Sequence, residues 1–114
     1  MKSVLTSIKQ MLGIAEEYTA FDDVLIMHIN SVFMILTQLG VGPLNGFTIK
    51  DDSDAWNDFV PDETKLELVK SYVYLKVKLL FDPPTISAVI ESINRQIDEF
   101  EWRLNVASES NTTL

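Results

Sequence analysis

The segment 21–39 is apolar around most of the circumference that it would have as a helix. Its main stripe advances in steps of four and three residues: Phe21, Leu25, Ile29, Val32, Leu36 and Leu39. Further apolar residues lie off that stripe: Val24, Ile26, Met27, Phe33, Met34 and Ile35. Such a helix must be covered on most sides, and a chain of 114 residues can rarely do this by itself.

We therefore expect a second subunit to cover part of this helix. The residues expected at that oligomer interface are Val24, Met27, Phe33, Met34 and Ile35. The alternative is a helix buried centrally within a monomer. Thr19 and Asp22, three residues apart, resemble a capping box at the start of this helix.

Three further segments have helical spacing. A short first helix is predicted to end at Gly13, after Val4, Leu5, Ile8, Met11 and Leu12. Residues 62–81 also fit a helix, although residues 73–79 alternate between apolar and polar as a strand would. Because neither Gly nor Pro interrupts this segment, one helix is the simpler interpretation. After Asp82-Pro83-Pro84-Thr85, a heptad pattern predicts a final helix: Ile86, Ile90, Ile93, Ile97, Phe100 and Leu104.

Residues 41–61 have the composition of one long ordered loop, with a tight turn expected at Asn45-Gly46. The loop carries four acids, Asp51, Asp52, Asp54 and Asp58. The simplest interpretation is a solvated acidic loop, and the alternative hypothesis is that these acids face a partner or a lumen. Phe47 and Trp56 are expected to contact a partner. An EF-hand register starting at Asp52 fails, because Asn57 replaces the required Gly and Trp56 occupies a ligand position.

The predicted fold is therefore all-α, a small bundle of about four helices with the long loop between the second and third main helices. We expect a single domain over residues 1–107 and a flexible C-terminal tail over residues 108–114.

The residues that usually carry chemistry are scarce. The chain has no cysteine and one histidine, His28, so thiolate sites and two-histidine metal sites are excluded. Its four glycines match no phosphate-binding loop. We expect no metal, no cofactor and no catalytic residues. An enzyme built from carboxylates, Tyr72 or Tyr74 and His28 is the least favoured alternative, since nothing in their spacing indicates a site.

The net charge of −8 argues against general nucleic-acid binding, because phosphates would repel the chain on average. Ser, Thr and Lys interrupt the apolar residues near Met1, so no signal-peptide core is present, and no stretch is long and apolar enough for a membrane span. We expect a protein without membrane contact that stays in the cell that makes it.

Three stretches resemble the small head–tail connector proteins (neck adaptor or head-completion proteins) of long-tailed bacteriophages. They are LTSIKQMLGI at 5–14, DVLIMHINSVFMILTQLGVGP at 23–43 and VKSYVYLKVKLLFDPPTISAVIESI at 69–93. The resemblance covers roughly residues 4–106. These are packing and turn residues rather than a catalytic signature.

The resemblance implies a structural protein made in the host bacterial cytoplasm and located in the neck of the virion. It implies a dodecameric ring beneath the portal protein, with DNA passing through the lumen without specific binding and a further neck, stopper or tail-completion protein below. The acidic loop would then repel passing DNA if it lined that lumen. The alternative is a cytoplasmic helical interaction module, an inhibitor or regulatory subunit in a small complex.

Overall fold

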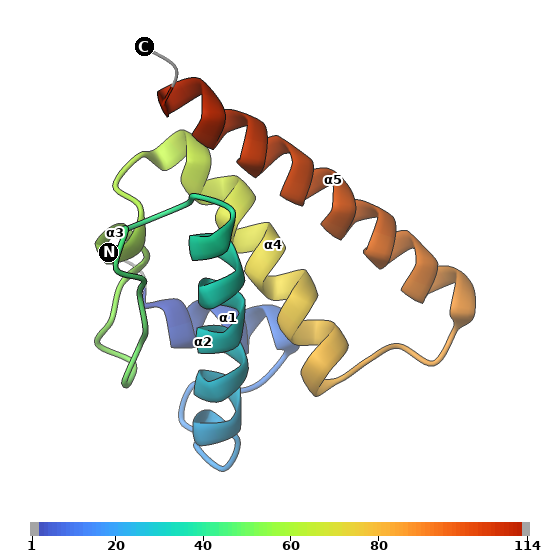
Figure 1. Ribbon diagram of the computed structural model, residues 1–114. Coiled ribbons are helices and arrows are strands. Elements are labelled where there is room, and N and C mark those ends of the chain that lie inside the picture. Colours follow the sequence, from blue (N-terminus) through green and yellow to red (C-terminus); the bar gives the residue numbers. More distant parts are fainter. Residues whose placement is uncertain (1–2, 113–114) are drawn as a thin grey trace.

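The computed structural model describes residues 3–112, with side chains through residue 107, and it is helical throughout its main elements (Figure 1). The helices are α1 (Val4–Leu12), α2 (Asp22–Gln38), α3 (Trp56–Phe59), α4 (Glu63–Phe81) and α5 (Ser87–Thr112). The predicted all-α fold is confirmed. Residues 73–79 are helical within α4, so their alternation does not mark a strand. Helix α3, a single helical turn inside the long loop, is not predicted by the sequence pattern.

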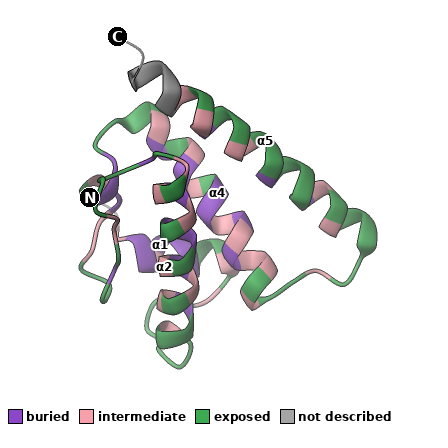
Figure 2. Ribbon diagram, in the orientation of Figure 1, coloured by how far each residue is buried: buried purple, intermediate pink, exposed green. Residues whose placement is uncertain are grey.

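Helix α4 lies at the centre of the bundle. It packs against α2 on one side and against α5 on the other, while α1 crosses beneath both α2 and α4. Figure 2 shows the buried positions gathered where these helices meet. The largest fully buried side chains include Trp56, Tyr72, Phe33, Phe59, Ile8 and Leu25. Because α4 separates α2 from α5, the outward faces of these two helices point to different sides of the molecule.

Helix α1 begins and ends as its sequence predicts. The Ser3 hydroxyl accepts a hydrogen bond from the Thr6 amide at 3.2 Å, and Gly13 closes the helix in the left-handed conformation with φ of 80°. The start of α2 differs from the prediction. Its N-cap is Phe21, without a side-chain cap, so the proposed Thr19–Asp22 capping box is wrong.

A buried lysine holds the start of α2 instead. Lys9 is 2% exposed, and its ammonium donates to the carbonyl oxygens of Glu16 and Tyr18 at 2.8 and 2.7 Å. The same ammonium lies 2.9 Å from Oδ1 of Asp22 in the first turn of α2. An acid in that position complements the positive end of the helix dipole as well as the lysine. The connection between α1 and α2 is thereby fixed.

Helix α5 contacts α4 through the predicted heptad pattern, but only along part of its length. Ile93, Ile97 and Leu104 are buried, whereas Ile86 is 63% exposed, because the chain diverges from α4 at that end (Figure 1). The Tyr72 hydroxyl donates to Oε2 of Glu101 at 2.7 Å and joins the two helices. Burial and this acceptor raise the pKa of Tyr72 above its ordinary value.

The helix α5 runs to Thr112, beyond the domain end expected at residue 107. The flexibility of residues 108–114 stays a prediction, and residues 113–114 lie outside the described part of the chain. Among the described residues, no helix has the length and hydropathy needed to cross a lipid bilayer.

Candidate interaction surface

Several apolar side chains on the outer face of α2 are exposed to solvent. Val24, Met27 and Met34 are 42%, 59% and 66% exposed, and they follow each other at helical spacing with Ser31 and Gln38 between and after them. The inner face of the same helix is buried through Leu25, Ile29, Val32 and Leu36. We call the exposed row, residues 24, 27, 31, 34 and 38, the outer stripe of α2.

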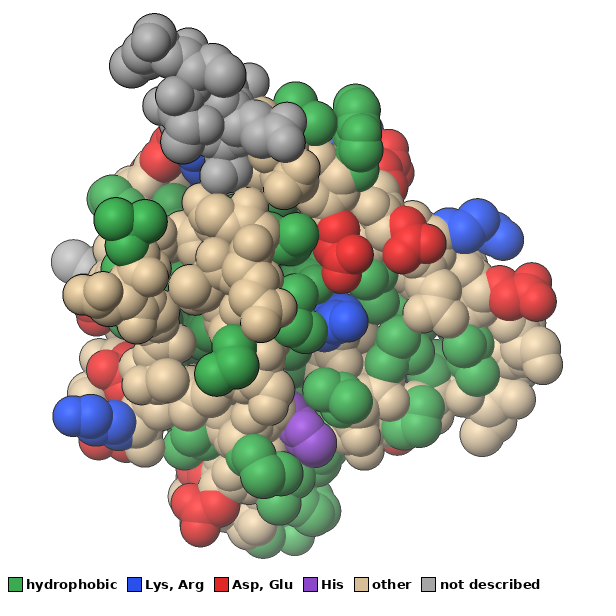
Figure 3. Space-filling model, in the orientation of Figure 1, with side chains coloured by type: hydrophobic (Ala, Val, Ile, Leu, Met, Phe, Trp, Pro, Cys, Tyr) green, Lys and Arg blue, Asp and Glu red, His purple; other side chains and the backbone are tan. Residues whose placement is uncertain are grey.

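A groove runs along this stripe, between α2 and the loop that follows it. Its two adjoining hollows have volumes of about 430 and 320 Å³. Met34, Asn30 and Thr48 line both hollows. None of the described residues that line either hollow is charged. In Figure 3 the surface over the upper part of α2 and the adjoining loop is hydrophobic or uncharged, and charged side chains lie mainly toward the periphery and over α4 and α5.

The loop wall of this groove is held in place by side-chain hydrogen bonds. The Asn30 amide donates to the Ile49 carbonyl at 3.0 Å, and its Oδ1 accepts from the Ile49 amide at 2.7 Å. The expected turn lies one residue earlier than Asn45-Gly46, since the Gly46 amide donates to the Pro43 carbonyl at 3.0 Å. Leu44 occupies the tip of this turn and is 98% exposed. The groove is therefore built from fixed backbone on both sides.

Two residues expected to face a partner lie in the subunit's own core. Phe33 is completely buried, and Trp56 is 1% exposed. Phe33 packs against the rings of Phe47, Phe59 and Trp56, with centroids 5.2, 4.6 and 6.2 Å away. The loop aromatics fold back onto α2 and cover the side of Phe33 that a subunit partner was expected to cover. The interface prediction for Phe33 and the partner-facing prediction for Trp56 are therefore wrong for the folded subunit, while Phe47 and Ile35 are half-buried.

Three of the four carboxylates in the acidic loop accept hydrogen bonds from backbone amides of the same loop. Asp51 accepts from the Ser53 amide at 2.8 Å, Asp54 from the Lys50 amide at 2.7 Å, and Asp58 from the Ala55 amide at 3.2 Å. The hydrogen bonds from Ser53 hold the pKa of the Asp51 carboxyl below its ordinary value. Asp52 is exposed, and its carboxylate has no hydrogen bond or ion pair with any described residue.

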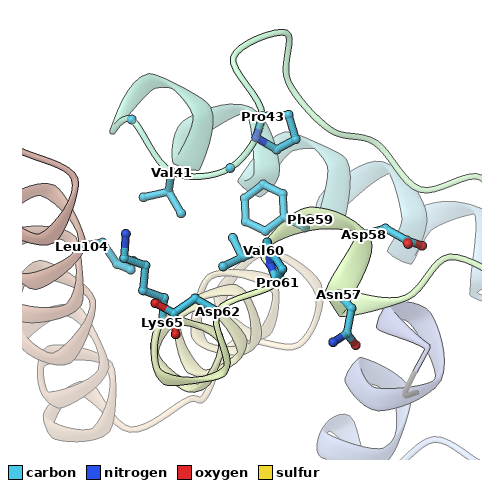
Figure 4. A pocket seen from close by; sticks show the side chains of 12 residues that line it. Val41, Pro43, Asn57, Asp58, Phe59, Val60, Pro61, Asp62, Lys65 and Leu104 are labelled. Atoms are coloured by element: carbon cyan, nitrogen blue, oxygen red, sulfur yellow. The ribbon is translucent and has the colours of Figure 1, made fainter. Parts of the chain in front are cut away.

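A further cavity, of about 570 Å³, lies where the two ends of the loop come together beside α4 and α5. Figure 4 shows Val41, Phe59 and Val60 around its apolar wall, with Leu104 of α5 on the opposite side. Asp62 lines it as well, but this carboxylate is the N-cap of α4 and accepts from the Thr64 amide at 2.9 Å. That bond and the bond from the Thr64 hydroxyl lower the pKa of Asp62.

Among the side chains of residues 3–107, no arrangement typical of catalysis accompanies these surfaces. His28 is half-buried on α2 and does not line the 570 Å³ cavity. The described residues contain no group of three or more histidine, cysteine or acidic side chains that could hold a metal ion. What the geometry offers is exposed apolar surface and shaped grooves, which serve association with proteins.

Sequence reasoning passed over several exposed apolar residues, among them Leu44 and Trp102. Leu44 lies in a loop, where the spacing of apolar residues does not indicate which of them are exposed. Trp102 lies on α5 and is 66% exposed. A signal for Trp102 was available, because the heptad positions of α5 include Phe100 and Leu104 and leave Trp102 on the outer side of the helix.

The described residues thus form a small helical domain with two grooved surfaces and exposed apolar rows. A comparison with protein families identifies the family of this chain. The model of a family described as phage connector protein matches residues 4–111, nearly the whole chain. The chain belongs to that family, which is structural rather than enzymatic. No curated protein and no solved structure matches the chain significantly.

Proposed function

We propose that this chain is a head–tail connector subunit that forms a ring beneath the portal and joins the DNA-filled head to the tail. The family match over residues 4–111 supports the connector role. The observation that carries the ring is the outer stripe of α2. Met27 and Met34 stay in water although the opposite face of their helix is packed, and ring contacts between subunits would cover them.

The partners in this proposal are further copies of the chain, the portal protein above and a stopper or tail-completion protein below. A dodecamer would match the number implied by the resemblance to neck adaptors. The finished ring would be part of the virion neck, assembled from subunits made in the bacterial cytoplasm. DNA would pass through the lumen without specific binding, which suits a chain of net charge −8.

The ring is tested by measuring molar mass with light scattering over a concentration series, alone and with purified portal rings of the same phage. We expect a discrete large species, or recruitment of many copies to the portal. Met34→Asp should dissociate it, whereas Met11→Asp, at an exposed methionine of α1, should leave it intact. A small fixed stoichiometry under every condition would instead support a cytoplasmic regulatory module. Phe33→Asp is unsuitable here, since it would place a charge in the core.

The role of the acidic loop needs a variant that changes its charge without unfolding it. Asp52 is the suitable position, because Asp51, Asp54 and Asp58 hold loop amides. If the loop lines the lumen, Asp52→Lys should slow DNA ejection and reduce infectivity. Glu17→Lys, an equal charge change at an exposed position of the loop between α1 and α2, serves as the control. Full infectivity of Asp52→Lys phage would place the loop away from the DNA path.

A further inference from the structure

A closed ring requires two different surfaces on each subunit, because each copy must contact a neighbour on either side through a head-to-tail contact. The groove along the outer stripe of α2 supplies one such surface. The fold places the second on the far side of α4, where α5 packs and turns its outer face away from the bundle. The exposed apolar residues there are Trp102 and Val106, 66% and 39% exposed.

Trp102 and Val106 lie on one face of α5, since they are four residues apart. Trp102 points away from the buried seam. It precedes Leu104 by two residues, and two steps along an α-helix correspond to a rotation of about 200° around the helix axis. A large aromatic side chain left in water on a packed helix is the kind of residue that dominates binding energy once a partner covers it. Nothing within the described subunit covers this face of α5.

The charges around the two surfaces are compatible. The described groove lining contains no charged residue. On α5, Arg103 and Glu99 beside Trp102 neutralise each other in an ion pair of 2.9 Å. Asp98, one helical turn before Trp102, is also exposed. The uncharged groove can receive Trp102 while Asp98 and the ion pair stay at the rim, where water still reaches them.

The chemistry of the groove also suits an indole. Met27 and Met34 offer polarisable sulfur for contact with an aromatic ring. The indole N–H needs an acceptor when it is buried, and Ser31, Gln38 and Thr48 present hydroxyl and amide oxygens along the same hollow. Asn30 is already engaged with Ile49, so it stays in place as part of the groove wall.

We infer that Trp102 and Val106 of one copy dock into the α2 groove of the next copy, as the repeating head-to-tail contact of the assembly. This inference rests on the proposed ring. It assigns the occupant of the groove as a second copy of this chain and gives α5 a role at the outer side of the bundle.

The first test is the size of assemblies formed by single variants, measured by light scattering under the conditions in which wild type assembles, alone or on portal rings. Trp102→Glu and Met34→Asp should each raise the concentration required for assembly by about 30-fold or more, the loss expected for a central anchor. Ile86→Glu is the matched control, because it adds the same charge at an exposed apolar residue just before α5. It should assemble as wild type does.

Mixing the two defective proteins gives the sharper test. In an equimolar mixture, Trp102 of the Met34→Asp subunit meets the intact groove of the Trp102→Glu subunit, so heterodimers should form and growth should stop there. Each protein alone should stay monomeric. A mixture without heterodimers overturns the proposed pairing, as does a Trp102→Glu protein that assembles normally.

Tryptophan fluorescence gives an independent readout. Trp56 is buried before assembly and Trp102 is exposed, so docking should shift the emission of Trp102 to shorter wavelength. An assembled wild type whose emission is unchanged would refute the pairing while leaving the ring intact. A wild type that stays monomeric alone and with portal rings would refute the ring itself, and the pairing would fall with it.

Discussion

Gly42 lies where the chain leaves α2 and approaches the ring of Phe59. Its φ is +87°, and a Cβ added there would overlap three carbon atoms of that ring, two of them at 2.7 and 2.9 Å. Phe59 lines the 570 Å³ cavity, but it is only 2% exposed, and its contacts with Phe33 and Phe47 oppose its displacement. Gly42→Ala therefore combines left-handed backbone strain with overpacking.

The magnitudes of these two effects can be added from their separate ranges. Left-handed strain costs about 1–2 kcal/mol for a residue with a Cβ. Overpacking in a filled core costs about 1–3 kcal/mol. We expect Gly42→Ala to lower the free energy of unfolding by about 2–5 kcal/mol, a large share of the ~5–15 kcal/mol typical of a domain.

Urea unfolding followed by circular dichroism measures this loss, with Gly13→Ala as the matched control. Gly13 has a φ of +80° but no described neighbour within 4 Å of the added Cβ, so it reports strain alone. The Gly42 variant should lose about 1–3 kcal/mol more than the Gly13 variant. Equal losses at both positions would show that the contact with Phe59 relaxes freely, and the packing argument would be refuted.

Three further predictions concern polar contacts. Lys9→Met should lower the free energy of unfolding in urea by about 3 kcal/mol, since the carboxylate of Asp22 and two loop carbonyls lose their buried partner; a loss below ~1 kcal/mol would contradict this. Tyr72 has a raised pKa, so its contribution to the free energy of unfolding is fully present below pH ~10 and is lost as the pH rises further. In Tyr72→Phe, the melting temperature should therefore fall less steeply at alkaline pH than it does in wild type. Asp62 has a lowered pKa, so its contribution is present above pH ~4 and is lost in acid; Asp62→Asn should unfold more easily at pH 7, with the difference from wild type shrinking in acid.

Local spacing was sufficient to predict the main helices. The apolar steps of residues 4–12, the stop at Gly13 and the break at Pro83-Pro84 depend on backbone preferences within a few residues, so each could be located without knowing the fold. The same reasoning failed at the start of α2. There Lys9 reaches across the connecting loop to Asp22, and a contact over that distance leaves no periodic signal.

The order of residues alone shows that α2 has too many apolar residues for one packed face. Helical periodicity fixes the angles between its side chains, so Met27 and Met34 had to share a side that differs from that of Leu25 and Ile29. The burial of Phe33 and the exposure of Met34, its neighbour in the chain, depend on how the loop packs in three dimensions. The physical reason is that the loop carrying Phe47, Trp56 and Phe59 folds back over one sector of α2 and leaves the next sector open, and such non-local packing is not encoded in the spacing of either segment.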